Sequence, residues 1–311
     1  MPRPRDQKGY KRGVQPDEDE ANAAPFGAAT TRVYRVIGDQ IPAESEADTL
    51  AIEEPLEIRI GFGPEGERQR VRLSVTMRTP GGPGDESDFE LAAGFLWTEG
   101  ILTAPDQIET IRHLGFPSLE GGYQNVVCAE LVPGATVELP NLERHVYTSS
   151  SCGVCGKTSL EAVRTSSRFT LTEGAGWQPD LIHRAPVVLR EAQAVFERTG
   201  GLHAAALFDT SGNLLVLRED VGRHNAVDKL IGSQVIAGAL PLTDRLLLVS
   251  GRASFELVQK AMMAGVPVLA AVGAPSSLAV QLARDCRVTL LGFVRGGRFN
   301  IYTMAERVRP A

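Results

Sequence analysis

The chain has 311 residues, of which 43% are hydrophobic and 23% are charged. These proportions are average for globular proteins, so they exclude wholesale disorder and allow one large or two modest domains. The net charge of -6 argues against a nucleic-acid binder with a generally basic surface. No apolar run approaches the ~20 residues that span a bilayer, and the polar start carries no secretory signal. Four cysteines are too few for a disulfide framework, which favours a reducing cytoplasm.

Residues 1–30 are expected to form a disordered arm, because they contain the acidic run Asp17–Glu20 and hardly any large apolar side chain. Three stretches then alternate apolar and polar residues as half-buried strands do, and a fourth strand is predicted further on. These strands are Thr31–Ile37, Leu56–Ile60, Val71–Met77 and Asn125–Val132.

One helix is predicted among these strands. Leu91, Phe95 and Leu96 fall on one face of it, Asp88 can cap its start, and Gly100 can end it. We therefore expect residues 31–147 to form a smaller N-terminal α+β domain.

Helices and strands alternate after about residue 175. Pro186 is predicted to start a helix that ends at Gly200, since proline favours the first helical turn. Such alternation indicates a mainly parallel sheet with helices on both faces, opened by one antiparallel hairpin, over residues 178–311. In chain order the predicted elements are strand Leu202–Phe208, turn Asp209–Asn213, strand Leu214–Arg218, helix 223–238, strand Arg245–Val249, helix 254–264, strand Val266–Val272, helix 276–284 and strand Arg287–Leu291.

The strongest chemical signal is the pair Cys152 and Cys155, two residues apart in a serine- and glycine-rich stretch. We expect residues 148–177 to be a mobile linker that carries this pair. The spacing fits zinc binding, a thioredoxin-like disulfide, an inert structural role or reactive thiols. Zinc would need two further ligands, but Cys128 and Cys286 are isolated and are expected to pack in the core.

Local electrostatics favours reactive thiols at this pair. The stretch Lys157–Arg164 reads as a short helix, so both cysteines precede a helix N-terminus. Free backbone N–H groups and the Lys157 charge would stabilise a thiolate there. The neighbouring glycines would leave the sulfur atoms accessible.

Three segments with small residues follow or interrupt strands. They are Ser250–Ser254, Gly273–Ser277 and Gly292–Arg298. In a parallel sheet, ligands bind outside the carboxyl ends of the strands, and the first two segments open helices whose N–H groups can hold phosphate. Arg252, Arg295 and Arg298 add positive charge. An anionic, nucleotide-like ligand at this edge is one interpretation, and simple glycine turns are the other.

Two further features are ambiguous. The segment Glu219–Lys229 gathers charges around a strand–helix junction, where Asp220 can be an N-cap and Asp228 and Lys229 a solvated face. His203 lies on an apolar strand, as a core histidine or as a site residue.

In combination, these motifs resemble the FdhD family, the formate dehydrogenase accessory sulfurtransferases. The resemblance covers about residues 31–305 and rests on Ala93–Leu96, Glu99–Ile101, Cys152–Gly156, Gly201–Ala205, Glu219–Lys229 and Ser250–Ser254. It implies a larger, cytidine-deaminase-like three-layer domain at the C-terminal end. It also implies a carrier that takes sulfur from a cysteine desulfurase and passes it to the molybdenum or tungsten bis-pyranopterin guanine dinucleotide cofactor of formate dehydrogenase.

The resemblance assigns roles to particular residues. Cys152 would carry the persulfide and Cys155 would assist, without zinc. Some members have a cysteine where this chain has Val294, so no third reactive thiol is expected there. A cytoplasmic homodimer is implied, with GDP as a fragment that mimics the cofactor. The segment that would contact the cofactor comprises Leu291, Gly292, Phe293, Val294, Arg295 and Gly296.

Two competing functions follow from the same residues. A zinc-dependent nucleobase deaminase needs H-x-E followed by P-C-x-x-C, but His203 is followed by two alanines and the cysteine pair precedes it. A cofactor chaperone without sulfur chemistry would still activate formate dehydrogenase after its cysteines are replaced by alanine.

Overall fold

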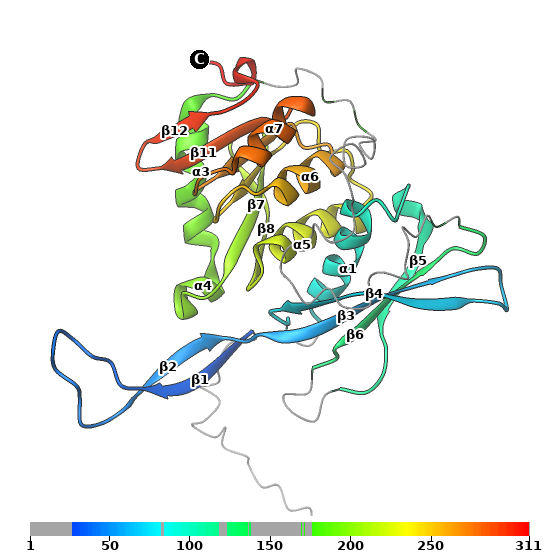
Figure 1. The fold of residues 1–311 in the computed structure, drawn as a ribbon, viewed down its shortest axis with the longest axis horizontal. Coiled ribbons are helices and arrows are strands. Elements are labelled where there is room, and N and C mark those ends of the chain that lie inside the picture. Colours follow the sequence, from blue (N-terminus) through cyan, green and yellow to red (C-terminus); the bar gives the residue numbers. More distant parts are fainter. Residues whose placement is uncertain are drawn as a thin grey trace, which may run out of the picture.

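The structure is a computed structural model that describes residues 27–81, 84–117, 123–135, 137, 169, 171 and 176–310. It confirms a mixed α/β protein, with a two-stranded ribbon, a four-stranded sheet and a six-stranded sheet (Figure 1). Within the described residues, no helix is both long enough and apolar enough to cross a membrane.

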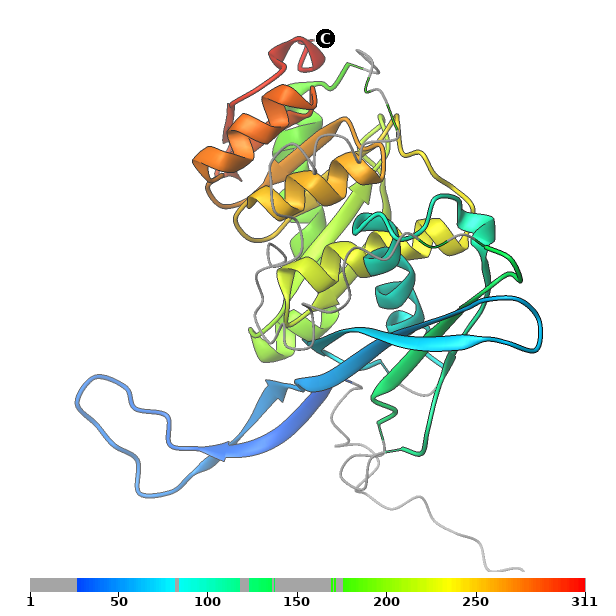
Figure 2. The ribbon, with the colours of Figure 1, turned by 45° about the vertical axis from the view of Figure 1, so that its right-hand side comes forward.

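The ribbon consists of β1 (Ala28–Val33) and β2 (Glu46–Ala51), which pair antiparallel and extend away from the body (Figure 2). β1 begins inside the segment predicted to be a disordered arm. It ends at Val33, so the predicted strand to Ile37 is too long. The chain reverses near Gly38, whose φ of 59° favours glycine, and this turn ends the pairing early.

The four-stranded sheet confirms the alternation predicted for Leu56–Ile60, but a register shift opposite Ile58 and Arg59 interrupts that of Val71–Met77 and leaves Val75 and Met77 exposed. The inward-facing side chains Leu56, Ile58 and Ile60 are fully or almost fully buried. β5 was not predicted, because its segment I-E-T-I-R-H alternates poorly. In spatial order the strands are β4 (Gln69–Arg78), β3 (Glu54–Phe62), β6 (Val126–Leu131) and β5 (Ile108–His113).

Helix α1 (Ser87–Thr98) lies against this sheet and corrects one prediction. Asp88 is not the cap, because it lies inside the first turn with its side chain buried. Its carboxylate accepts two hydrogen bonds from Arg78, at 2.8 and 2.9 Å, and lies 3.2 Å from His113 Nε2. Burial alone would raise the pKa of Asp88, but its bonds with His113 and Arg78 lower it below the usual 3.8.

The six-stranded sheet is mixed rather than mainly parallel. β9, β10 and β11 are parallel, but β7 runs antiparallel to β9 as well as to β8, so the hairpin does not simply extend a parallel sheet. In spatial order the strands are β12 (Arg298–Ile301), β11 (Thr289–Arg295), β10 (Val268–Ala271), β9 (Leu246–Val249), β7 (His203–Phe208) and β8 (Leu214–Asp220).

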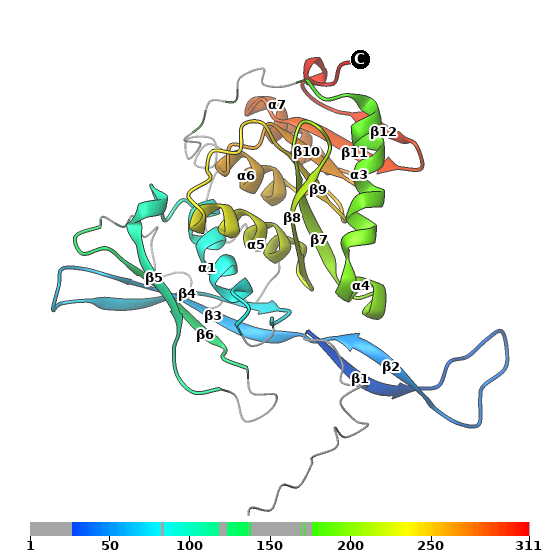
Figure 3. The same ribbon diagram turned by 180° about the vertical axis from the view of Figure 1, so that it is seen from behind.

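Helices cover both faces of this sheet, as predicted. α3 (Pro179–Ala192) and α4 (Ala194–Thr199) lie on the face seen in Figure 3. The other face is covered by α5 (Arg223–Ile236), α6 (Phe255–Met263) and α7 (Ser277–Asp285) (Figure 1). Strand alternation divides the core accordingly, since Ala204, Ala206 and Phe208 belong to the α3 side, and Ala205 and Leu207 to the other.

The helix predicted to start at Pro186 starts at Pro179 instead. Pro179 takes the first helical turn, where a missing N–H costs nothing, and Pro186 lies inside α3. The helical segment breaks at Gln193, and α4 ends at Gly200, whose φ is 64°. The prediction that the helical segment ends at Gly200 is therefore confirmed. The predicted start is wrong, because either Pro179 or Pro186 could occupy a first helical turn and the structure uses Pro179.

The segment Gly292–Arg298 was predicted to be a strand-end loop, but most of it is a hairpin. β11 continues to Arg295 with a register shift near Phe293, whose φ is 55°. Gly296 and Gly297 then turn the chain into β12, which the sequence did not predict. The glycines that indicated a loop supply the hairpin turn.

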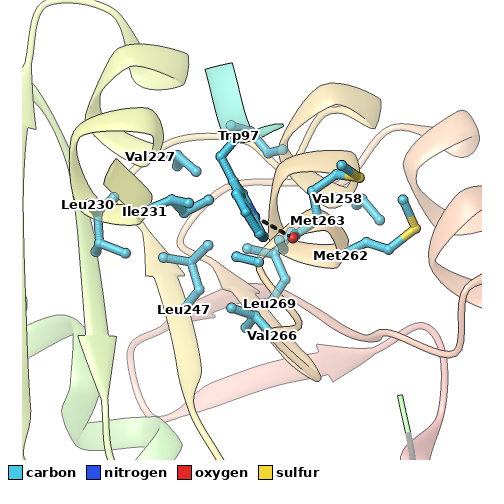
Figure 4. Close-up of a cluster of buried hydrophobic side chains, with 14 of the residues drawn as sticks. Trp97, Val227, Leu230, Ile231, Leu247, Val258, Met262, Met263, Val266 and Leu269 are labelled. Carbon is cyan, nitrogen blue, oxygen red and sulfur yellow. Dashed lines mark hydrogen bonds between the residues drawn. The ribbon is translucent and has the colours of Figure 1, made fainter. Parts of the chain in front are cut away.

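The two sheets share one hydrophobic cluster through α1 and α5. A Cβ atom on Gly94 would lie 1.9 Å from Asp228 O, and one on Gly232 would lie 1.7 Å from Glu90 O. The two helices therefore touch through their backbones. Figure 4 shows the core beside this contact, where the Trp97 indole donates a hydrogen bond of 2.7 Å to Met263 O. The predicted division into domains stays a prediction.

Buried ion pairs surround the same helix crossing. Lys260 Nζ lies 2.8 Å from Asp228 Oδ2, and Lys229 Nζ lies 2.7 Å from Asp220 Oδ2. All four side chains are buried, so Asp228 and Lys229 do not form a solvated face. Asp220 is not a cap for α5 either, because Gly222 occupies that position. The charges of Glu219–Lys229 are thus largely structural.

Candidate functional site

Cys152, Cys155 and the predicted linker lie outside the described residues, except for isolated positions at its end, so their reactivity and mobility stay predictions. Cys128 is buried in β6, and Cys286 packs against the main core cluster, as expected. Burial, with the nearby Glu130 carboxylate, raises the pKa of Cys128 to about 11. Cys128 is therefore a neutral thiol at neutral pH and a poor nucleophile.

The three segments predicted to meet at one sheet edge do meet there. Gly273 N donates a hydrogen bond of 2.9 Å to Gly251 O, and Phe293 N donates one of 3.0 Å to Gly273 O. A Cβ on Gly273 would lie 3.0 Å from Gly251 O, and one on Gly292 would lie 2.8 Å from Pro275 Cδ. A side chain at Gly273 would press on the backbone of Gly251 and Arg252, and one at Gly292 would meet the side chains of Pro275 and Tyr302.

The first two segments open helices, as predicted. Ser254 precedes α6, and Ser276 caps α7 by accepting a hydrogen bond of 3.2 Å from Ala279 N. Arg252, within the first loop, is exposed. Arg295 and Arg298 are also exposed, but they flank the β11–β12 turn beyond the loops. The edge thus brings together the starts of α6 and α7, with the exposed Arg252 in the loop that precedes α6.

Helices α5 and α6 begin side by side with a polar cluster between them. His224 Nε2 lies 3.4 Å from Ser254 Oγ and 3.8 Å from Glu256 Oε2. Burial alone would raise the pKa of Glu256, but hydrogen bonds from the Ser254 hydroxyl and the backbone, with electrostatic interactions with His224 and Arg223, lower it. Serine and carboxylate approach the same ring nitrogen, so this is not a serine-hydrolase triad, in which they bind opposite nitrogens.

His203 is half-buried at the start of β7, beside Gly251 and Arg223. A Cβ on Gly251 would lie 3.4 Å from His203 Nδ1 and 4.0 Å from Arg223 Cδ. Burial, reinforced by the Arg223 charge, lowers the pKa of His203 below 6.5, so its ring is neutral at neutral pH. Among the described residues, the buried Arg223 Nε has no hydrogen-bond partner. His203 is therefore only half-buried and is not a fully enclosed core histidine.

A hollow of about 430 Å³ lies beside His203, on the α3 face of the sheet. The hollow was not predicted from the sequence, because no periodic pattern indicates the break between α3 and α4. The pair Gly200–Gly201, which lines the hollow, was the one sequence feature that pointed to this place. Within the described part of the chain, no three His, Cys, Asp or Glu side chains are grouped to hold a metal ion. The hollow is lined by Pro186, Leu189, Arg190, Gln193, Phe196, Gly200, Gly201, Leu202, His203, Ser250 and Val272.

Comparison with known proteins places this chain in a family. Residues 51–309 match the model of the FdhD/NarQ family. A Streptomyces avermitilis protein named sulfur carrier protein FdhD is 53% identical over 264 residues, which cover 84% of this chain and 89% of the relative. A Mycobacterium tuberculosis protein of the same name is 48% identical, over 91% of this chain and 99% of its own.

A solved structure shows the same fold. It comes from Desulfotalea psychrophila, and its description names a formate dehydrogenase accessory protein. The TM-score is 0.67 at 21% identity, with 91% of this chain and 99% of the other covered. The family model matches most of the chain and the relatives share about half of its residues. This chain therefore belongs to the FdhD/NarQ family.

Proposed function

We propose that the protein is a cytoplasmic sulfur carrier required for formate dehydrogenase activity. The observation that carries the proposal is family membership: relatives named sulfur carrier protein FdhD are about half identical over 84% or more of the chain. The Cys152–Cys155 pair supplies the thiols that such a role needs. The client is the formate dehydrogenase catalytic subunit, and the active form is a homodimer.

Sulfur loading is a thiolate exchange on Cys152. The Cys152 thiolate attacks the outer sulfur of a persulfide on a cysteine desulfurase, and the sulfur–sulfur bond of that persulfide breaks. A persulfide forms on Cys152, and the desulfurase leaves as a thiolate. No electrons are gained or lost overall, because one persulfide replaces another. The acceptor must be ionised near neutral pH, which the predicted helix start after the pair favours.

Delivery uses the second thiol. The Cys155 thiolate attacks the inner sulfur of the Cys152 persulfide, forming a Cys152–Cys155 disulfide and releasing the outer sulfur as hydrosulfide. The two cysteine sulfurs together lose two electrons, and the released sulfur gains them. A cellular dithiol reductant must then restore both thiols. A C-x-x-C turn brings the sulfur atoms within bonding distance, with Gly153 easing the turn.

The molybdenum or tungsten bis-pyranopterin guanine dinucleotide cofactor is the substrate that receives the sulfur. In this proposal it binds along Leu291–Gly296, with Arg252, Arg295 and Arg298 on its phosphates. Support comes from the register shift between Gly292 and Arg295 and from the exposure of the three arginines. Guanidinium groups pair well with phosphate oxygens.

A cytidine-deaminase-like arrangement of the larger domain is part of the proposal. The strand order β8-β7-β9-β10-β11 between two helical layers supports it. Deaminase chemistry is not proposed, since His224 at the start of α5 is followed by Asn225 and Ala226, without the glutamate that moves protons. The α6 start has Ser254 instead of a cysteine ligand.

The test combines mass spectrometry with rescue of formate dehydrogenase in cells that lack this protein. After incubation with desulfurase and cysteine, one extra sulfur should appear on the peptide that contains Cys152. Cys152→Ala should abolish loading and rescue, whereas Cys155→Ala should load sulfur but rescue poorly. Cys286→Ala is the control and should behave as wild type. The proposal is wrong if the Cys152→Ala protein loads sulfur and activates the enzyme; rescue without loading would indicate a chaperone.

A further inference from the structure

The face of the four-stranded sheet that points away from α1 carries a row of arginines. Arg72 of β4 pairs with Arg59 of β3. Arg59 pairs in turn with Cys128 of β6, which pairs with Arg112 of β5. Residues that pair across strands share one face of a sheet, and the next residue of β3, Ile60, packs on the α1 side (Figure 1). Three arginines therefore lie in one row across the outer face.

The carboxylates beside this row do not neutralise it. Glu130, in the neighbouring row, accepts hydrogen bonds from Arg68, Arg70 and Arg112, at 3.1, 2.6 and 3.3 Å. Ion pairs on this side of the sheet join five arginines and three glutamates, a net charge of +2, in a chain whose net charge is -6. This basic face consists of Arg59, Arg68, Arg70, Arg72, Arg112, Glu57, Glu109 and Glu130.

Arg72 shows the excess of positive charge most clearly. Its Nη1 lies 4.0 Å from Glu57 Oε2, which is too far for a hydrogen bond. Like charges directly opposite each other in a strand pair destabilise a sheet, and Arg72 lies opposite Arg59. Arg70, Arg72 and Arg112 are each about half exposed, so a carboxylate can reach them. Because guanidinium groups bind carboxylates well, the basic face suits an acidic peptide.

An acidic run of the chain itself is attached beside the basic face. Gly27, the first described residue, accepts a hydrogen bond of 2.8 Å from Ile52 N, just before the start of β3. A Cβ on Gly27 would lie 3.0 Å from Thr79 Cγ2, just after the end of β4. The run Asp17–Glu20 lies outside the described residues and ends seven positions before Gly27. The basic residues of the same segment, within Arg3–Arg12, are further away along the chain.

The acidic run is close enough along the chain to reach the arginine row. Seven residues in an extended chain span up to ~23–25 Å. Arg59 lies five residues along β3 from Glu54, which corresponds to ~17 Å. We propose that Asp17–Glu20 binds across the basic face, with its carboxylates on the arginine row. This inference does not depend on the proposed function, because it involves neither the cysteine pair nor the strand-end loops.

NMR of the ¹⁵N-labelled full chain tests the contact through the amide signals of Asp17–Glu20. Raising NaCl from 50 to 500 mM shortens the screening length to ~4 Å and should shift these signals in the wild type. The double variant Arg59→Gln/Arg72→Gln should show the high-salt positions already at 50 mM. Arg184→Gln/Arg198→Gln is the matched control, because it removes two exposed arginines from α3 and α4. It should leave the signals at their wild-type positions.

A second measurement uses a variant that leaves the sheet untouched, in case the arginine variant fails to fold. It replaces the acidic run by Asp17→Asn, Glu18→Gln, Asp19→Asn and Glu20→Gln. The probe is a synthetic peptide of residues 14–24, titrated into each full chain by calorimetry. The attached run competes at an effective concentration of ~1 mM, so the peptide should bind the neutralised variant about tenfold more tightly than the wild type.

Three outcomes would overturn the inference. The first is an Asp17–Glu20 spectrum that is the same in the wild type and in folded Arg59→Gln/Arg72→Gln. The second is equal affinity of the peptide for the wild type and the neutralised variant, which would mean that the basic face is open to an acidic partner instead. The third is a neutralised variant that does not bind the peptide at ~1 mM.

Discussion

The α1–α5 crossing and the strand-end edge both gather charged residues, but they use them differently. At the crossing, Lys260 is bonded to Asp228 and Thr98, and Lys229 to Asp220 and the Thr79 carbonyl. At the edge, Arg223 keeps a buried donor without a partner among the described residues, and Arg252 is exposed. Charged groups with hydrogen-bond partners fix how the helices pack, whereas a donor without a partner remains able to bind a ligand.

The difference predicts separate consequences for variants. A buried ion pair contributes little net stability but is costly to break, because the remaining charge is left uncompensated. A donor without a hydrogen-bond partner, such as Arg223 Nε, breaks no hydrogen bond when it is replaced. Variants at the crossing should therefore unfold the protein, and variants at the edge should alter binding without unfolding it.

Gly232→Ala should have the largest effect. Its new Cβ would lie 1.7 Å from Glu90 O, which is backbone and cannot rotate away, so α1 and α5 must separate. We expect a loss of about 3 kcal/mol or more in the free energy of unfolding, measured by urea denaturation. Ile236→Ala, at an exposed position at the end of α5, is the control and should change little. Wild-type stability in Gly232→Ala would refute the close contact.

Lys260→Met should rank second. It leaves the Asp228 carboxylate buried beside Thr98 without its cation, which should cost about 3–5 kcal/mol in the free energy of unfolding. Adding Asp228→Leu should recover much of this loss, because both charges are then gone. Chemical denaturation of the single and double variants measures the coupling. A double variant that is no more stable than the single variant would contradict the ion-pair account.

The crossing was only partly predictable from the sequence. Alternation in Leu56–Ile60 and the apolar face of α1 follow from local patterns, so those elements could be predicted. Gly94 and Gly232 are far apart in the chain, and glycine inside a helix carries no sign of its partner. Asp228 and Lys229 resemble an exposed pair for the same reason: burial depends on the neighbouring helix, which the sequence does not show.

The edge was more predictable for its loops than for its hollow. The carboxyl ends of parallel strands share one edge, so the meeting of Gly251, Gly273 and Gly292 follows from topology. The hollow depends on the break between α3 and α4 at Gln193 and on Phe196, which is one of the residues that line it. Neither has a periodic signal. The segment Gly292–Arg298, most of which forms the β11–β12 hairpin, was predicted to be a loop because its glycines are typical of both.

Asp88→Asn should have a moderate, pH-dependent effect. The bonds with His113 and Arg78 hold the pKa of Asp88 below its usual 3.8, so its stabilising contribution is complete above that value and disappears as the pH falls through the folded-state pKa. At pH 7 the variant should lose about 1–3 kcal/mol, since the amide oxygen still accepts a bond from Arg78.

Below pH 3.8 the two proteins should therefore converge in stability, which denaturation at several pH values can measure. Asp106→Asn, in an exposed 3₁₀ turn, is the control and should follow wild type throughout. A constant difference between wild type and Asp88→Asn from pH 7 to pH 2 would contradict the ionised pair with Arg78.

Arg223→Gln should have the smallest effect on stability, about 1 kcal/mol or less in the free energy of unfolding, because its Nε has no hydrogen-bond partner among the described residues and its interaction with Glu256 is only a favourable charge contact. Its effect should appear in the titration of His203. Burial and the Arg223 charge both lower the His203 pKa, so removing the charge should raise that pKa toward 6.5, measured by NMR of the imidazole.

Arg252→Gln provides the matched comparison, because Arg252 is exposed in the adjacent loop and is not among the groups that shift His203. It should leave the His203 titration unchanged. Burial, the larger cause, persists in both variants, so the pKa should stay below 6.5 in each. If Arg223→Gln destabilises the protein by several kcal/mol, Arg223 belongs with the packing charges of the α1–α5 crossing. If the His203 pKa does not move, Arg223 is not the cation that lowers it.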